Sequence, residues 1–178
     1  MHSRPNKKAL TTKEIVVFAM LGAILLISKI LMEWAPNIHF IGMLLMTYTV
    51  VYRKKALIPL YVFVLLEGVY AGFNLWWVPY VYIWLPLWGA TMLLPKNMPS
   101  KVAVPVYMVV CALGGLLYGT FYAPFQAFAF GLSFKGMIAW IAAGIPFDIL
   151  HAAGNFAAGS LIYPLSKLII KVEARSNT

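Results

Sequence analysis

Residues 12–33, "TKEIVVFAMLGAILLISKILME", are apolar along most of their length and carry charges only near their two ends. An α-helix needs about 20 such residues to cross the hydrocarbon core of a bilayer. Thr11 or Thr12 can cap the start of this helix, and no small-residue cleavage site follows it. We therefore interpret the stretch as a retained transmembrane span rather than a signal peptide.

The composition of the whole chain supports this interpretation. The 178 residues are 62% hydrophobic and 11% charged, and the mean hydropathy is +0.83, whereas soluble domains are about 45–50% apolar and about 25% charged. Long apolar stretches favour helices over the alternating segments of an outer-membrane barrel. The sequence thus predicts an all-α integral membrane protein that forms a single domain over residues 1–178. The lone cysteine, Cys111, supports no intrachain disulfide and no cysteine-based metal site.

Six apolar segments fit transmembrane helices packed in one bundle. The predicted spans cover residues 12–33, 38–52, 56–70, 79–94, 102–122 and 146–170. Pro146 suits the first turn of the last helix. Residues 123–145, which are apolar but interrupted by Pro124 and Gly131, are predicted to form a re-entrant or interfacial segment before it.

The basic residues predict the orientation of these six spans. An even number of spans places both termini on one side of the membrane, and 12 of the 14 basic residues then fall on that side. They are Arg4, Lys7, Lys8, Lys13, Arg53, Lys54, Lys55, Lys96, Lys101, Lys167, Lys171 and Arg175. The positive-inside rule predicts that both termini are cytoplasmic, in a multi-pass protein of the cell membrane. This asymmetry explains the net charge of +9 without nucleic acid.

Three polar residues lie in the last predicted span, where a charged group costs roughly 2.5–3.5 kcal/mol. The spacing of Asp148, His151 and Asn155 places them on one face of a helix. We expect this face to line a ligand site, although hydrogen bonding between helices is the alternative. Asp148 has a further alternative, because its position just after Pro146 also suits a cap of the same helix.

The third predicted span repeats this spacing at Glu67, Tyr70 and Asn74, on the condition that its helix continues past the predicted end at Tyr70. In the predicted topology both sets of polar residues lie in the outward-facing half of the membrane. Two polar faces at similar depth are able to line one cavity, and hydrogen bonding between helices is again the alternative.

Aromatic residues add a third candidate wall. Trp77, Tyr80, Trp84 and Trp88 follow helical spacing. An interfacial belt explains Trp77 and Tyr80, whereas Trp84 and Trp88 would lie roughly 10 and 16 Å deeper than Trp77. We expect Trp88 to pack against neighbouring helices. For Tyr80 and Trp84, packing and a stacking surface for a flat ligand are both open.

Small residues recur at four-residue spacing on three predicted spans. Ala19 and Ala23 form an A-x-x-x-A pattern, and Gly115 and Gly119 form a G-x-x-x-G pattern. Such patterns allow helices to approach closely, and we expect most of them to serve internal packing. Motifs of metalloproteases, serine hydrolases and nucleotide-binding loops are missing from the sequence, so active transport would need partner subunits.

These features resemble the substrate-binding S-components of energy-coupling factor vitamin transporters. The resemblance extends over the whole chain: six spans in under 200 residues, basic cytoplasmic ends and an aromatic-rich outer side. The Ala19-x-x-x-Ala23 pattern matches the motif by which that family docks on its coupling subunit. The stretches "GLLYGTFYAPFQAFAFGLSFKGMIAW" and "FDILHAAGNF" are similar to the family's region between the fifth and sixth helices.

The resemblance implies a function for the chain. S-components bind one vitamin or related nutrient in an outward-facing pocket that is covered by the loops between spans 1–2, 3–4 and 5–6. They dock on a transmembrane coupling subunit with two ATPases, and Ala19 and Ala23 would belong to that docking face. The pocket candidates in this chain, which the residue patterns also support, are Glu67, Tyr80, Trp84, Asp148, His151 and Asn155.

The polar residues within the spans also bear on the ligand. No arginine lies among them, and Lys29, near the outer end of the first span, is the only nearby cation for a carboxylate ligand. We therefore expect a neutral or cationic heteroaromatic nutrient, such as a vitamin, a vitamin precursor or a nucleoside, with no metal and no other cofactor. Two alternatives remain: a tryptophan-rich translocator-type binding protein that works without ATPases, and an intramembrane enzyme that uses Asp148 and His151.

Overall fold

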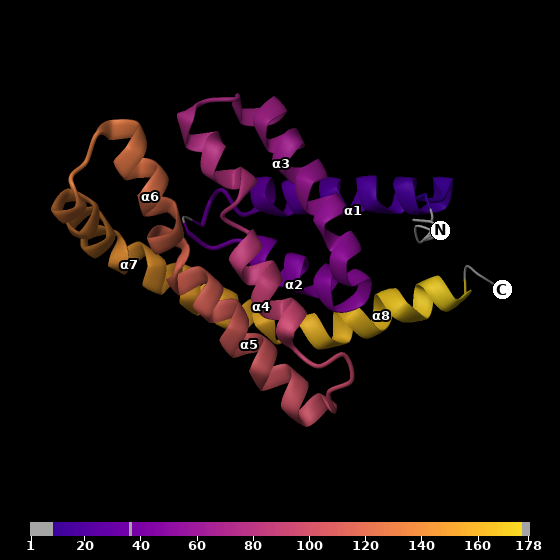
Figure 1. Cartoon of the computed structure of the whole chain (residues 1–178). Helices are drawn as coiled ribbons and strands as arrows, with labels where there is room; N and C mark the ends of the chain where they lie inside the picture. The colour runs from indigo at the N-terminus through magenta and orange to yellow at the C-terminus, as the bar shows by residue number, and fades with distance from the viewer. Residues whose placement is uncertain (1–8, 36, 176–178) are drawn as a thin grey trace, which may run out of the picture.

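The computed structural model describes residues 9–35 and 37–175, and all regular structure in this part of the chain is helical (Figure 1). The all-α prediction is thereby confirmed. The helices are α1 (Thr12–Leu31), α2 (Ile41–Tyr52), η1 (Arg53–Ala56), α3 (Leu57–Ala71), η2 (Leu75–Val81), α4 (Leu85–Leu93), α5 (Ser100–Leu116), α6 (Tyr118–Phe130), α7 (Phe134–Gly159) and α8 (Ile162–Arg175), where η denotes a 3-10 helix.

Three helical stretches within the described residues are long and apolar enough to cross a membrane. They are α1 with 20 residues, the continuous stretch α5–α6 with 31 residues and α7 with 26 residues. In contrast, α2, α3 and α4 have 12, 15 and 9 residues, so at about 1.5 Å per residue each is shorter than the hydrocarbon core of about 30 Å. The helices are those of a possible multi-pass membrane protein, and the six-span topology stays a prediction.

The short helix α2 occupies the centre of the bundle. Eight of its residues are buried, and it contacts α1, α4, α5, α7 and α8. Two buried hydroxyl groups on this helix donate hydrogen bonds to carbonyl oxygens of the preceding turn. Thr47 Oγ1 donates to the Met43 carbonyl oxygen at 2.8 Å, and Thr49 Oγ1 donates to the Leu45 carbonyl oxygen at 2.7 Å. A central helix of this kind leaves the longer helices at the periphery, where their apolar faces are exposed.

Residues 123–145, predicted as a re-entrant or interfacial segment, do not form a segment separate from the neighbouring helices. Residues 123–145 complete α6 and begin α7, and these two helices pack against each other as a hairpin. Gly131 ends α6 in the left-handed conformation, with φ 64°, and Ser133 caps α7 by accepting a hydrogen bond from the Gly136 N–H at 3.2 Å. Pro146 therefore lies inside α7 rather than at its start. Membrane helices tolerate an internal proline because neighbouring groups can satisfy the freed carbonyl.

The last predicted span, residues 146–170, is also divided differently. The helix that carries its polar face ends at Gly159, and α8 starts at Ile162 after a turn. α8 carries Lys167, Lys171, Glu173 and Arg175 among apolar residues and packs on α2 and α5.

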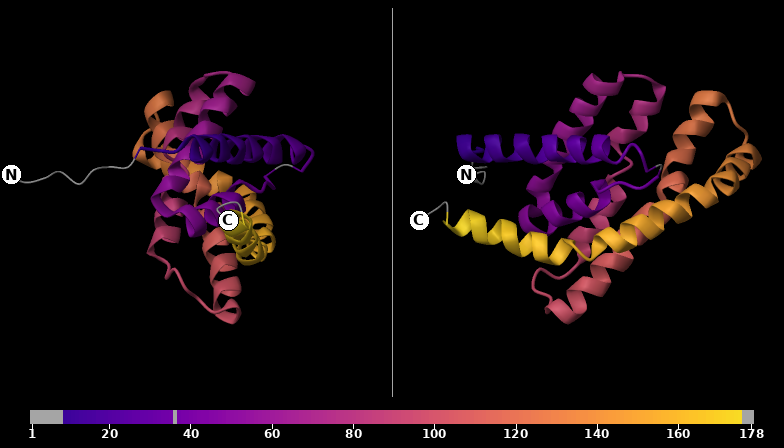
Figure 2. Two further views of the ribbon diagram at one scale, coloured as in Figure 1. Left: turned by 90° about the vertical axis from the view of Figure 1, so that its right-hand side faces the viewer. Right: turned by 180° about the vertical axis from the view of Figure 1, so that it is seen from behind.

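The start of α1 and the end of α8 lie on one side of the bundle, whereas the α6–α7 hairpin projects on the opposite side (Figures 1 and 2). The turn η1 and the connection between α4 and α5 lie in the half of Figure 1 that contains the start of α1 and the end of α8.

Glycines set the close approach of α5 and α7, which form the most extensive helix pair of the fold. A Cβ atom on Gly115 would lie 2.8 Å from the carbonyl carbon of His151, and one on Gly159 would lie 2.7 Å from the Cα of Met108. Both obstacles are backbone atoms, which cannot move without separating the helices. The prediction that the Gly115 pattern serves internal packing is confirmed.

Replacing Gly115 with alanine should therefore destabilise the protein. Overpacking of this kind costs roughly 1–3 kcal/mol, which corresponds to a fall in melting temperature of roughly 2–12 °C for a chain of this size. Gly144→Ala on α7 is the matched control, because nothing lies within 4 Å of a Cβ at that position. Equal melting temperatures for the two variants in detergent would contradict this account of the α5–α7 contact.

Candidate functional site

The polar residues of α7 face the interior of the bundle. Asp148, His151 and Asn155 are 5%, 9% and 5% exposed, whereas Phe147 and Ile149 beside them are exposed. The helix is thus apolar on the outside and polar on the inside, which is the pattern of a membrane helix around a polar site. The prediction that the three residues share one face is confirmed.

Asp148 binds the start of a neighbouring helix. Its Oδ1 accepts a hydrogen bond from the backbone N–H of Gly119, in the first turn of α6, at 3.1 Å. A Cβ on Gly119 would lie 2.5 Å from Oδ2, so only glycine leaves room for the carboxylate. The alternative that Asp148 caps its own helix is wrong, because α7 begins at Phe134, and the helix that it caps is α6.

His151 lies one turn further along α7 and contacts two other rings. Its ring centroid lies 5.0 Å from that of Tyr118 and 5.1 Å from that of His39. Its Nδ1 lies 4.0 Å from Asp148 Oδ1, which is too far for a hydrogen bond. His39 belongs to the connection between α1 and α2, so the two histidines join distant parts of the chain.

Asn155 fits between two glycines. A Cβ on Gly42 of α2 would lie 3.2 Å from Asn155 Nδ2, and a Cβ on Gly115 of α5 would lie 2.8 Å from the same atom. Because Gly42 and Gly115 have no side chains, α2 and α5 leave space for the Asn155 amide of α7. The amide is thereby held at the point where α2, α5 and α7 meet.

Trp84 forms the aromatic wall of the same region. It is 4% exposed, and its ring centroid lies 5.8 Å from Tyr80, 5.8 Å from Tyr118 and 6.0 Å from His39. Aromatic pairs at such distances attract each other through offset or edge-to-face contacts. The tryptophan is therefore fixed in position by rings on three sides.

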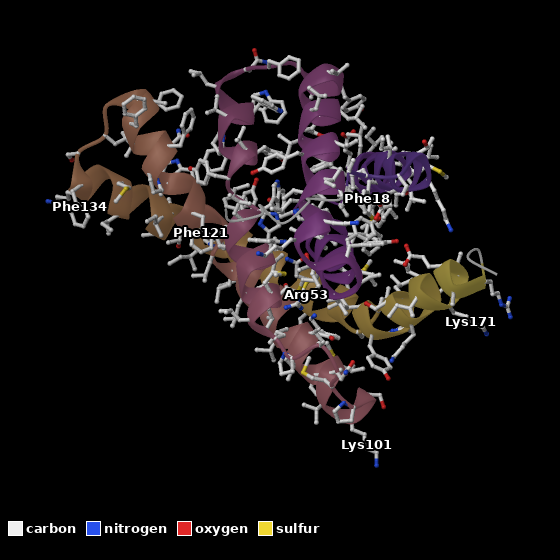
Figure 3. All side chains as sticks on the ribbon, turned by 45° about the vertical axis from the view of Figure 1, so that its right-hand side comes forward. Phe18, Arg53, Lys101, Phe121, Phe134 and Lys171 are labelled. Carbon is white, nitrogen blue, oxygen red and sulfur yellow. The ribbon has the colours of Figure 1, made fainter. Side chains whose placement is uncertain are left out.

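These groups enclose a small cavity with a volume of about 10 Å³. A space of this size holds about one water molecule. Its lining residues come from the α1–α2 connection, the η2–α4 segment, α5, α6 and α7: His39, Ile83, Trp84, Leu87, Gly114, Gly115, Tyr118, Phe121, His151 and Asn155. Phe121 lies close to the junction of α5 and α6 (Figure 3).

Three polar atoms of residues that line the cavity are buried without a hydrogen-bond partner in the described part of the chain. They are His39 Nδ1, Trp84 Nε1 and His151 Nδ1. The great majority of buried polar atoms in proteins are paired, and leaving one unpaired costs about 1–3 kcal/mol. Three unpaired atoms around one cavity are typical of a site that is completed by a bound molecule.

Glu67 lies apart from this cavity. It is fully buried, and its Oε1 pairs with Lys29 Nζ of α1 at 2.8 Å. Lys29 also lies 4.0 Å from Glu33. The pair joins α1 to α3, so in this conformation Glu67 takes part in a contact between helices.

The predicted polar face of the third span does not form. α3 ends at Ala71, and Gly72 follows with φ 92°, so Asn74 lies beyond the helix. Both Tyr70 and Asn74 are exposed. A φ in this range interrupts helical periodicity, which is why the spacing from Glu67 to Asn74 was misleading.

The predicted aromatic stripe is divided between two elements. Trp77 and Tyr80 belong to η2, Trp84 precedes α4, and Trp88 lies within α4. Trp77 Nε1 donates to the Val64 carbonyl oxygen at 2.8 Å, and Trp88 Nε1 donates to the Arg53 carbonyl oxygen at 3.4 Å. The prediction that Trp88 packs against neighbouring segments is confirmed.

Tyr80 supports the aromatic wall from outside the cavity. Its ring centroid lies 5.5 Å from Trp76 and 6.2 Å from Phe63. Of the predicted binding residues, the cavity therefore brings together Trp84, His151 and Asn155, with Asp148 and Tyr80 directly behind them.

Two polar lining residues, His39 and Tyr118, were not predicted from the sequence. His39 lies at the start of the second predicted span, and Tyr118 lies inside an apolar helix. The rarity of histidine, which occurs three times in the chain, is the one signal that would have indicated His39. Among the described residues, no three histidine, cysteine, aspartate or glutamate side chains are grouped to hold a metal ion.

No family model, curated protein or solved structure matches the chain.

Proposed function

We propose that the chain is the substrate-binding subunit of an uptake transporter, and that it binds a small heteroaromatic nutrient between His39, Trp84, His151 and Asn155. The observation that carries this proposal is the set of buried, unpartnered polar atoms on His39, Trp84 and His151. A ligand with a flat ring and a polar edge would stack on the aromatic side chains and pair with these atoms.

The cavity must enlarge to admit such a ligand. Small-molecule sites have volumes of roughly 300–1,000 Å³, whereas this cavity has about 10 Å³. In this proposal the structure corresponds to a closed conformation of the site. His39 is the wall residue on a connection between helices, so displacement of residues 37–40 is the simplest opening.

The charges around the site favour a neutral or cationic ligand. Lys29, the nearby cation that a carboxylate ligand would need, is already paired with Glu67 at 2.8 Å and lies 4.0 Å from Glu33. A ligand carboxylate would have to compete with both acids for that ammonium group.

The outer face of α1 suits a partner helix. Ala19 is exposed and Ala23 is half-buried, and both lie beside the exposed apolar residues Met20 and Ile27. Small side chains let the backbone of a second helix approach closely. We propose this face as the docking surface for a transmembrane coupling subunit that works with two ATPase subunits.

We propose further that both termini are cytoplasmic and that the chain crosses the cell membrane six times. The start of α1, the end of α8 and η1 lie in one half of Figure 1, which supports this orientation. In a Cys111→Ala background, a membrane-impermeant thiol reagent should label Ser133→Cys on intact cells and Lys54→Cys only after permeabilisation. Both positions are exposed, and the reverse pattern would contradict the orientation.

The direct experiment is to identify what co-purifies with the protein. Mild purification of the wild type, followed by extraction and mass spectrometry, should release a ring-containing small molecule in a fixed ratio to protein. The same molecule should be lost from a His39→Leu/His151→Leu variant. Equal amounts in both preparations would contradict the assignment of the site.

A further inference from the structure

A second pocket lies far from the first, where α8 meets α5 and the α4–α5 connection. It has a volume of about 280 Å³. Its polar lining consists of Lys96, Asn97, Tyr107, Tyr163, Ser166 and Lys167. Ser166 Oγ already donates a hydrogen bond to the Ile162 carbonyl oxygen at 2.7 Å. The Lys167 ammonium lies 5.5 Å from the centre of the Tyr163 ring. Two ammonium groups and an amide thus border one space.

No acidic side chain balances these lysines. All five acids of the chain lie elsewhere. Glu14 pairs with Lys55, Glu33 and Glu67 lie around Lys29, and Asp148 binds Gly119. Glu173 borders grooves next to α1 and does not line this pocket. The only charged residues among those that line the pocket are therefore the two lysines, which is typical of a site for an anion.

The start of α5 adds to this positive field. The helix has 17 residues and begins at Ser100, and within the described structure no side chain caps its first turn. The free backbone N–H groups of a helix start and its dipole attract anions. Pro99, the residue before the helix, lines the same pocket.

Apolar surface surrounds the pocket and indicates which anion it suits. Val50 and Ile170 line its wall, and the side chains of Ile170 on α8 and of Val102 in the first turn of α5 are exposed. A free phosphate would leave this surface uncovered, whereas the acyl chains of a lipid would cover it. Basic pockets between membrane helices bind the headgroups of anionic lipids in this way.

We propose that this pocket binds the phosphate of an anionic phospholipid, held by Lys96, Lys167 and Asn97, with its acyl chains along α5 and α8. Figure 3 shows Lys101 at the tip of α5, with its side chain projecting away from the bundle, and Lys171 towards the end of α8. Neither of these two lysines lines the pocket. The proposed site thus includes only two of the lysines on this part of the surface. It shares no lining residue with the nutrient site.

The test compares retention of two lipids by the full chain in native mass spectrometry. Wild-type protein in mixed micelles should retain dioleoyl-phosphatidylglycerol in preference to dioleoyl-phosphatidylcholine. Lys96→Gln/Lys167→Gln should weaken this preference by about fivefold for each lysine. Lys54→Gln/Lys171→Gln is the matched control, because it removes the same charge from exposed residues that do not line the pocket.

Each outcome decides the proposal. Loss of the preference in the pocket variant alone supports it, provided that the variant keeps the wild-type melting temperature. Equal losses in both variants would show only a general effect of positive charge and would overturn it, as would equal retention of the two lipids by the wild type. Displacement of phosphatidylglycerol by excess inorganic phosphate would assign the site to free phosphate and would overturn the proposal that it binds a phospholipid.

Discussion

Replacing Lys29 with methionine is expected to lower the free energy of unfolding by about 3–5 kcal/mol, because it leaves a buried charge without its partner. Glu67 is fully buried, and its carboxylate lies 2.8 Å from the Lys29 ammonium. A chain of this size loses roughly 2–4 °C of melting temperature per kcal/mol. The variant should therefore melt well below the wild type in detergent.

The control for this prediction is the double variant Lys29→Met/Glu67→Met. Removing both charges leaves no unpaired ion, so most of the lost stability should return. A double variant as unstable as the single one would show that the pair does not hold α1 against α3. The single variant Glu33→Gln should have little effect, because Glu33 is exposed and lies 4.0 Å from Lys29.

Removing the two histidines of the cavity should have the largest effect on binding. His39→Leu/His151→Leu deletes two buried polar groups, each of which would contribute up to about tenfold in affinity through one hydrogen bond. We expect the affinity for the co-purifying molecule to fall by about 100-fold, measured by isothermal titration. Without ligand, the variant should melt no lower than the wild type, because the deleted Nδ1 atoms have no partner in the described structure.

This combination of weaker binding and undiminished stability separates a binding role from a structural one. Histidines that only hold the helices together would lose stability when replaced. A variant that melts well below the wild type but binds the molecule normally would contradict the proposed site.

The tryptophans offer a finer comparison. Trp84→Phe removes an indole N–H that has no partner in the described residues, whereas Trp88→Phe removes one that donates to the Arg53 carbonyl oxygen at 3.4 Å. Both changes remove buried volume and should cost stability, but only the first should weaken binding, by up to about tenfold. The opposite result would place the ligand elsewhere.

The sequence predicted the helical class and the shared face of Asp148, His151 and Asn155, because both depend on local composition and period. The interaction partner of Glu67 could not be predicted. Helical spacing indicates which residues share a face of one helix, but it does not indicate which other helix packs against that face. The partner of Glu67 turned out to be Lys29 on α1. His39 was missed for a related reason, because a residue on a connection between helices has no period.

The helix boundaries were predicted least well where proline and glycine had to be interpreted. Pro146 was expected to begin a helix and instead lies inside α7, whose cap is Ser133. Asn74 was placed on the third span on the condition that the helix continued past Tyr70, and Gly72 instead ends α3 with φ 92°. In both cases the outcome depends on tertiary contacts, which one sequence does not contain.

The most direct test of the central claim is a thermal-shift measurement on the purified protein with a panel of vitamins, vitamin precursors and nucleosides. A ligand present at 100 times its dissociation constant stabilises the folded state by about 2.7 kcal/mol. The proposal predicts that at least one heteroaromatic compound of the panel raises the melting temperature of the wild type by several degrees and that of His39→Leu/His151→Leu by none. No stabilisation by any compound, or equal stabilisation of both proteins, would contradict it.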